Sequence, residues 1–253
     1  MAANLFASRY VEGITYVTVV VVLSLAAAFL FPGLFPLEDV TLYLTVAGLI
    51  YGLFAAFAIG VSWDRYSRIV EYLHEEVGAL INIHELVKHI TDRKSAHAIN
   101  KQMLDYLTHV TSVQWKDYFD SEESHKKFRK LFALFGNINM KGEKDAQLFD
   151  DVGDDLKDAS RVREQQLVLS NTPLSPNIWA LLLLLSGSVV VGVFTVEFTN
   201  TILGVFTKFI MSLSSFVILF VIHQIDALEL AAKEIEEEPI KKLIKLIKSE
   251  HRF

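Results

Sequence analysis

Residues 49–80 read LIYGLFAAFAIGVSWDRYSRIVEYLHEEVGAL, and the character of this stretch changes at Trp63. The 24 residues from Val40 to Trp63 include no Asp, Glu, Lys or Arg. After Trp63, apolar residues recur every three or four positions, as on one helix face, with His84 in the same series: Ile69, Leu73, Val77, Leu80, His84, Val87 and Ile90. No proline interrupts them, so we expect one helix from Leu42 to Ile90 that begins in a membrane and leaves it. At 1.5 Å per residue it is about 73 Å long.

Three further runs are long enough to cross a bilayer. Residues 13–37 and 165–196 include no Asp, Glu, Lys or Arg, and residues 198–225 include only Lys208. A bilayer core needs about 20 apolar helical residues. The sequence therefore predicts an all-α integral membrane protein with four transmembrane helices, at 14–35, 41–62, 177–197 and 201–223. The first run is longer than the apolar core of a signal peptide and leads into a second span, so an uncleaved anchor fits it better.

The spans form two hairpins, because residues 36–40 and 198–200 are short connections. We expect four segments: a first transmembrane hairpin (1–63), a helical cytoplasmic domain (64–172), a second transmembrane hairpin (173–225) and C-terminal cytoplasmic helices (226–253). Neither connection contains a basic residue, and Glu38, Asp39 and Glu197 lie in or beside them, whereas basic residues flank the opposite ends: Arg9, Arg65, Arg68, Arg161, Arg163 and Lys233. The positive-inside rule then places both termini on the cytoplasmic side of the cell membrane.

Capping residues divide the central segment into helices. Ser95 and Ser121 are suitable N-caps for a second and a third helix, and Gly136 is a suitable end for the third. A fourth helix is expected from Glu143 to Leu169, before Pro173 breaks the chain. The fourth span is expected to continue past Asp226 and Leu230 to Glu238, with Pro239 as its stop.

Several classes of function are not supported by the residues. There is no glycine-rich phosphate loop, no histidine pair at i,i+4 with a neighbouring glutamate, and no nucleophile elbow, so we expect no enzyme. The chain has no cysteine, and His84 and His89 lie on different faces of a helix, so we expect no metal and no cofactor. Residues 64–172 hold 16 basic and 19 acidic residues, which argues against binding to nucleic acid.

The order of residues from about 45 to 230 resembles the bestrophin-like family of four-span membrane proteins, which is related in topology to the bestrophin channels. The resemblance lies in FAIGVSWDRYSRIVEYLHEEVGALINIHEL (57–86), in MLDYLTHVTSVQWKDY (103–118), in ASRVREQQL (159–167) and in the pair Ile225–Asp226. The matching positions include Trp63, Glu71, Glu75, Leu80, Tyr106, Val110, Trp115, Arg161, Arg163, Leu167, Pro173 and Trp179. Two departures are Gln114, where the family has an acidic residue, and residues 227–229, where it has a Pro-Phe-Gly-like turn.

The resemblance implies a homopentameric anion channel whose pore is lined by the second span and its extension. On that span, one helical stripe could form a hydrophobic constriction, or it could face lipid and neighbouring helices: Ile50, Phe54, Phe57 and Val61. A second stripe would line a cytoplasmic vestibule, or form a solvated helix face: Glu71, Glu75, Gly78 and Asn82. Carboxylates in a vestibule favour cations, which conflicts with the anion selectivity that the resemblance implies, so the sign of the permeant ion stays open.

Charged residues near the last span have alternative roles. Lys208 is the only ionisable residue inside a span, and it either extends towards the outer connection near Glu197 or attracts anions. Asp226 could pair with Arg65 or Arg163. The carboxylates of residues 234–238 resemble a calcium-binding cluster of some bestrophins in composition only, and a solvated acidic run fits them better: Glu234, Glu236, Glu237 and Glu238. The basic amphipathic stretch IKKLIKLIKSEHR (240–252) either lies on the inner leaflet or packs against residues 64–172.

The sequence therefore supports the hypothesis of a homo-oligomeric, pentameric bestrophin-like ion channel, with the lipid bilayer and inorganic ions such as chloride as its partners. The alternative is a non-conducting membrane scaffold or sensor whose cytoplasmic helical domain recruits a partner.

Overall fold

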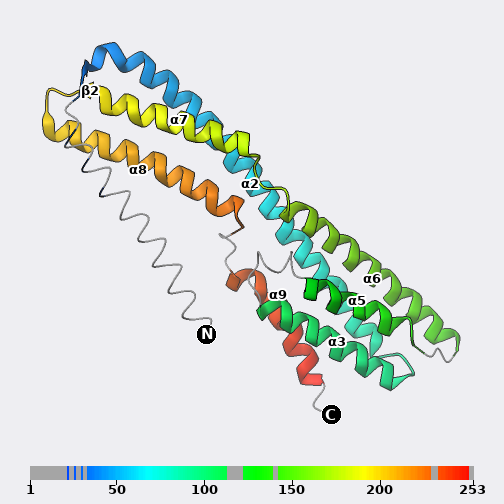
Figure 1. The fold of residues 1–253 in the computed structure, drawn as a ribbon. Helices are drawn as coiled ribbons and strands as arrows, with labels where there is room; N and C mark the ends of the chain where they lie inside the picture. Colours follow the sequence, from blue (N-terminus) through cyan, green and yellow to red (C-terminus); the bar gives the residue numbers. More distant parts are fainter. Residues whose placement is uncertain are drawn as a thin grey trace. The chain divides into compact units, whose positions relative to one another are not determined.

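The computed structural model describes residues 33–112, 122–138, 142–228 and 233–250, together with Val22, Ala26 and Leu30. In these ranges the chain forms helices and one pair of two-residue strands (Figure 1): β1 (Phe35–Pro36), α2 (Leu37–Val87), α3 (Arg93–Ser112), α5 (Glu122–Phe135), α6 (Glu143–Ser170), α7 (Pro176–Thr195), β2 (Val196–Glu197), α8 (Thr201–Asp226) and α9 (Lys233–Glu250). This confirms an all-α fold. The expected first span, 14–35, lies almost entirely outside the described residues.

The chain divides into two compact units. Unit 1 consists of residues 1–61 and 174–223, and unit 2 of residues 62–173 and 224–253. Within the described ranges, three helices are long and apolar enough to cross a membrane: α2 from Val40 onwards, α7 and α8. The expected continuity of the second span with the helix that follows is confirmed, because α2 runs unbroken for 51 residues.

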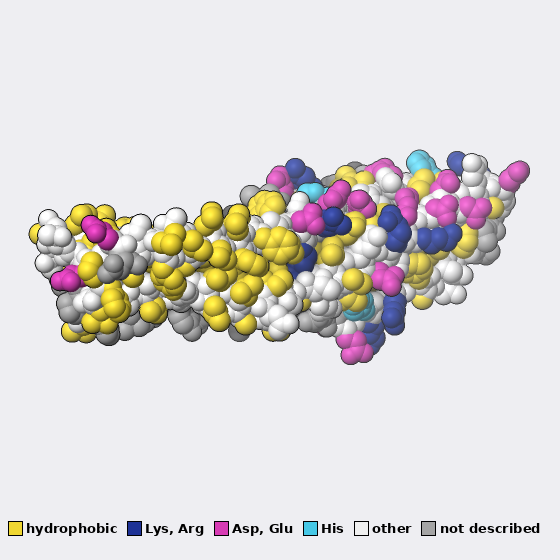
Figure 2. Space-filling view, turned by 90° about the horizontal axis from the view of Figure 1, so that it is seen from above, with side chains coloured by type: hydrophobic (Ala, Val, Ile, Leu, Met, Phe, Trp, Pro, Cys, Tyr) yellow, Lys and Arg dark blue, Asp and Glu magenta, His cyan; other side chains and the backbone are white. Residues whose placement is uncertain are grey.

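In unit 1, α7 and α8 pack against the first half of α2 (Figure 1). Small side chains on the buried face of α2 let the helices approach: Ala47, Ala55 and Ala58, with Tyr51 among them. The Tyr51 hydroxyl donates to the Ser215 carbonyl at 3.1 Å. On α7, a Cβ at Gly192 would lie 2.6 Å from the Tyr43 ring, so this position requires glycine for close packing. Hydrophobic side chains dominate the outer surface of this unit (Figure 2).

In unit 1, two short parallel strands pair with each other: β1 precedes α2, and β2 follows α7. Phe35 pairs with Val196, and the backbone N–H of Leu34 donates to the Thr195 carbonyl at 2.8 Å. Gly33 precedes them with φ +96°, and a Cβ there would lie 2.3 Å from the Val196 carbonyl oxygen. Only glycine fits this conformation and this close approach.

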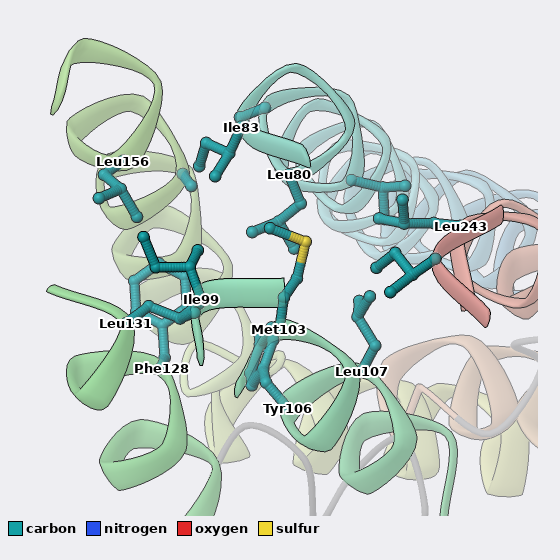
Figure 3. Packing of buried hydrophobic residues seen from close by; sticks show 14 of the residues in the cluster. Leu80, Ile83, Ile99, Met103, Tyr106, Leu107, Phe128, Leu131, Leu156 and Leu243 are labelled. Carbon is teal, nitrogen blue, oxygen red and sulfur yellow. The ribbon is translucent and has the colours of Figure 1, made fainter. Parts of the chain in front are cut away.

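Unit 2 has its hydrophobic core between two layers of helices, with α2 and α6 on one side and α3, α5 and α9 on the other (Figure 3). The helical periodicity predicted after Trp63 is confirmed. All seven side chains of that series are at most 3% exposed: Ile69, Leu73, Val77, Leu80, His84, Val87 and Ile90. They meet Met103 and Tyr106 of α3, Phe128 and Leu131 of α5, Leu156 of α6 and Leu243 of α9 (Figure 3).

The predicted helix boundaries need correction at α3. This helix begins at Arg93, and its cap is Asp92 rather than Ser95. The Asp92 carboxylate accepts from the backbone N–H of Lys94 at 3.2 Å, and the Ser95 hydroxyl donates to the same carboxylate at 2.6 Å. Either Ser or Asp can cap a helix, so the residues alone did not decide between them. Gly136 follows the end of α5, as predicted, whereas Ser121 lies outside the described residues.

The predicted extension of the fourth span is wrong. The helix α8 ends at Asp226, and Leu228 has φ +56°, a left-handed conformation that an apolar residue rarely adopts. Leu228 is only 6% exposed within the core of unit 2, so its burial offsets the strain. The departure from the family's Pro-Phe-Gly-like turn therefore changes the residues and not the presence of a turn.

Pro239 also does not stop a helix, because it lies inside α9. A proline inside a helix costs about 3 kcal/mol. Three side chains on the following turns offset this cost because they are at most 1% exposed in the core of unit 2: Ile240, Leu243 and Ile247. Of the two alternatives for the basic stretch, the apolar face therefore packs against unit 2, with α3 as one neighbour.

Candidate functional site

The stripe predicted on the second span lies on the surface of unit 1. The exposed fractions are 39% for Ile50, 40% for Phe54, 58% for Phe57 and 43% for Val61. The neighbouring Tyr51, Ala55 and Ala58 of the same helix face the core instead. The four side chains are therefore available to lipid, to solvent or to another protein chain, as a pore-lining surface must be before assembly.

The second stripe lies on the same helix in unit 2. Glu71, Glu75 and Asn82 are all exposed. A shallow depression of about 590 Å³ runs along this face of α2, lined in the described structure by Ser67, Val70, Glu71, His74 and Glu75. An apolar surface and an acidic surface thus follow each other along one helix.

Asn82 contacts the neighbouring helix α6. Its amide donates to the Asp155 carboxylate at 3.4 Å. Burial raises the pKa of Asp155 above its ordinary value of 3.8, the hydrogen bond from Asn82 lowers it, and the carboxylates of Asp158, Asp151 and Asp154 raise it. Of the three predicted vestibule residues, the two glutamates are thus open to solvent and Asn82 is engaged with α6.

Lys208, on α8, is almost fully buried, with 3% of its surface exposed. Its ammonium lies 5.9 Å from the centre of the Phe198 ring, which belongs to the connection between α7 and α8. Phe198 packs closely on α8 because residue 204 is glycine: a Cβ there would lie 2.8 Å from the Phe198 Cβ. The aromatic ring therefore covers the side of Lys208 towards that connection, and an aromatic face is a favourable neighbour for a cation.

Asp226 pairs with Arg65, one of its two expected partners. The Arg65 Nη1 lies 3.5 Å from the Asp226 carboxylate, and Nη2 donates to the Asp226 carbonyl. Both side chains are less than one tenth exposed. This ion pair connects the turn that follows α8 to the part of α2 that belongs to unit 2.

Arg163, the other expected partner, is part of a polar network in the core of unit 2 that the sequence did not reveal. The Tyr106 hydroxyl donates to Glu76, Arg163 donates to the Tyr106 hydroxyl, and the Gln166 amide donates to Glu76 at 3.0 Å. The Arg163 guanidinium is 3.6 Å from the Glu76 carboxylate and lies over the rings of Tyr106 and Phe128, at 5.2 and 5.3 Å. A usable signal existed: Glu76 is next to Val77 on the apolar face of its helix.

Among the residues that the structure describes, no group of three or more His, Cys, Asp or Glu side chains could hold a metal ion. His84 is buried and hydrogen-bonded to Asn100 at 2.8 Å. In the acidic run at 234–238, Glu238 pairs with Lys242 at 2.8 Å, whereas the side chains of the other three glutamates lie outside the described structure.

Comparison with known proteins places this geometry in a family. The family model described as "Bestrophin-like domain" matches residues 14–228. No curated protein matches the chain. Among solved structures, a bacterial bestrophin homologue from Klebsiella pneumoniae with a leucine-to-threonine mutation is 9% identical, with a TM-score of 0.67 and coverage of 92% of this chain and 96% of the other.

Two further solved structures are also similar to this chain. A second mutant of the Klebsiella pneumoniae homologue, with isoleucine changed to threonine, is 11% identical, with a TM-score of 0.65 and coverage of 93% and 97%. A structure described as a membrane protein with a proline-to-alanine mutation is 9% identical, with a TM-score of 0.69 and coverage of 92% and 96%. At such low identity these neighbours establish the fold alone. Together with the three apolar helices, they identify an all-α membrane protein.

Proposed function

We propose, from the premise that this chain belongs to the bestrophin-like family, that it forms a homo-oligomeric ion channel. Copies of α2 surround the pore, Ile50, Phe54, Phe57 and Val61 form a hydrophobic constriction, and Glu71 and Glu75 line the vestibule beyond it. A ring of apolar side chains can gate an ion pathway by excluding water. By analogy with the bestrophins the ring is a pentamer and lies in the cytoplasmic membrane.

The observation that carries this proposal is the exposed surface of α2. A helix that served only to anchor the chain could expose apolar side chains to lipid, but the same helix continues with exposed glutamates in unit 2. A helix that contributes one apolar and one acidic surface along its length suits a pathway with a constriction and a hydrated vestibule.

The proposal is tested by flux through purified protein in liposomes, under potassium chloride gradients with ion substitution. Phe57→Ala widens the constriction, and we expect the flux to rise several-fold. The matched control is Leu184→Ala on α7, which truncates a 67% exposed apolar side chain outside the proposed pathway and should leave the flux unchanged. Absence of flux from the wild-type protein would refute the channel and favour the non-conducting scaffold or sensor.

The same preparation decides the sign of the ion. The analogy favours anions such as chloride, whereas the acidic vestibule favours cations. If Glu71 and Glu75 contact permeating ions, Glu71→Gln together with Glu75→Gln shifts the reversal potential towards that of chloride. Glu85→Gln, which removes an exposed carboxylate paired with Lys88 at 2.7 Å, is the control and should shift nothing. An unchanged reversal potential in the double variant would exclude the two glutamates from the pathway.

The proposed orientation places both termini in the cytoplasm. The chain has no cysteine, so a single introduced cysteine reports its own side of the membrane. Thr199→Cys, in the exposed connection before α8, should react with an impermeant maleimide added to intact cells. Ser249→Cys, near the end of α9, should react only after the membrane is opened. The reverse pattern would overturn the orientation.

A further inference from the structure

The two helix layers of unit 2 carry opposite charge. From Ser62 to Val87, α2 has five acidic and two basic residues, and α6 has eight acidic and four basic residues. On the other side of the core, α3 and α5 together have seven basic and three acidic residues. The helix α9 is balanced, with five basic and five acidic residues, but four of its lysines and none of its carboxylates lie in residues 240–249. One layer is therefore strongly acidic and the other basic.

Some contacts join the two layers: Phe135 of α5 stacks on Phe149 of α6 at 4.2 Å, and the Tyr106 hydroxyl of α3 donates to Glu76 of α2. Asn82 and Glu76 of α2 are hydrogen-bonded to α6, whereas α3 packs against both α5 and α9. The apolar core lies between the layers, so their charges face outwards (Figure 3). Charged side chains of both signs cover the surface of this unit (Figure 2).

Ion pairs inside the unit leave part of this charge uncompensated. On the basic side, Lys127 pairs with Asp105 of α3 at 2.6 Å, and on the acidic side, Lys157 pairs with Asp154 at 2.8 Å. Three exposed basic residues of α5 have no ion pair with the described residues: Lys126, Arg129 and Lys130. The same holds on α6 for two exposed carboxylates, Asp150 and Asp151. We call these two sets the basic patch and the acidic patch.

We propose that the basic patch of one copy docks on the acidic patch of a neighbouring copy. Two different surfaces of one chain that attract each other form a head-to-tail contact, which closes into a ring when the rotation between copies allows it. A second copy is the partner that the charges favour, because it supplies a patch of each sign. An anionic lipid surface would attract only the basic patch. This inference rests on the homo-oligomer of the proposed function and adds which faces meet.

The test is charge reversal in the full-length protein, with subunit number measured by native mass spectrometry in detergent. Lys126→Glu with Lys130→Glu, and separately Asp150→Lys with Asp151→Lys, should each weaken the assembly. Two lost attractions and the new repulsion correspond to about a tenfold rise in the dissociation constant between copies. Combining all four substitutions restores opposite charge across the contact, so the assembly should recover.

The control exchanges Glu85 and Lys88, which reverses one exposed ion pair without changing the charge of the layer, and it should leave the subunit number unchanged. For the wild-type oligomer, the protein concentration below which it dissociates should increase when sodium chloride is raised from 0.05 to 0.5 M, because salt screens exposed charges. The proposal is overturned if the assembly responds neither to salt nor to charge reversal. It is also overturned if the variant with all four substitutions fails to restore the assembly. Flux measured on the same samples separates the two ideas: an intact salt-sensitive ring without flux refutes the channel and leaves the interface standing.

Discussion

Replacing Arg163 with methionine tests whether the buried polar network stabilises unit 2. The guanidinium is 3.6 Å from the Glu76 carboxylate, and the side chains are 7% and 2% exposed. Methionine keeps most of the apolar volume but removes the cation from beside a buried carboxylate. We therefore expect a large loss of stability, caused by the unpaired buried carboxylate and not by a packing defect.

The magnitude follows from the environment of the pair. Breaking a buried ion pair by removing one partner costs about 3–5 kcal/mol. The guanidinium also lies over the rings of Tyr106 and Phe128, and a desolvated contact of this kind contributes about 2 kcal/mol. These terms overlap, so we expect a total loss of about 4 kcal/mol. Tyr106→Phe removes only the hydroxyl between Glu76 and Arg163 and should cost about 1.5–3 kcal/mol.

The assay is equilibrium unfolding of the full-length protein in mixed micelles titrated with dodecyl sulfate, followed by far-ultraviolet circular dichroism. Arg161→Met is the matched control: it is on the same helix, and its side chain is 57% exposed and 3.5 Å from Asp158. Exposed pairs contribute about 0–1 kcal/mol, so this variant should resemble the wild type. A loss below about 1 kcal/mol for Arg163→Met, or equal losses for the two variants, would refute the reasoning.

Two further predictions concern packing and pH. Gly192→Ala places a Cβ 2.6 Å from the Tyr43 ring and should destabilise the protein by about 1–3 kcal/mol. The control is Gly187→Ala on the same helix, whose Cβ meets nothing within 4 Å and should not destabilise the protein. Equal unfolding midpoints for the two variants would contradict this prediction. Because burial raises the pKa of Asp155, the native state binds its proton more tightly than the unfolded state, so stability falls as pH rises from about 3.8 through the raised pKa. Asp155→Asn should therefore have a higher melting temperature than the wild type at pH 7 and lose that advantage at pH 3. If the difference in melting temperature between variant and wild type is the same at both pH values, titration of this carboxylate is excluded as the cause.

The helices were predictable where local pattern decides them. The spacing of Ile69, Leu73, Val77 and Leu80 marks a buried helix face, and the structure buries all four. The end of α8 was not predictable, because Ala227 and Leu228 favour a helix by propensity. A left-handed turn at Leu228 exists because its side chain fits the core of unit 2, and such a tertiary contact leaves no local pattern.

The candidate site was predictable in part. The exposed stripe from Ile50 to Val61 follows from helical periodicity, although an apolar surface by itself does not show whether lipid or a pore lies against it. Asn82 follows the same periodicity, yet its contact with Asp155 depends on where α6 lies. The network of Glu76, Tyr106 and Arg163 joins residues 30 to 87 positions apart, so only the folded chain brings it together.

The sequence by itself determined the membrane character, the helical fold and the resemblance to bestrophin-like proteins. These depend on hydropathy, local periodicity and residue order, all of which are properties of neighbouring residues. Only the tertiary structure decided that Asp226 pairs with Arg65, that Arg163 pairs with Glu76, and that the apolar face of α9 packs into unit 2. Such choices depend on the distance and rotation between helices far apart in the chain, because a charge or an apolar face takes the partner that packing brings within reach.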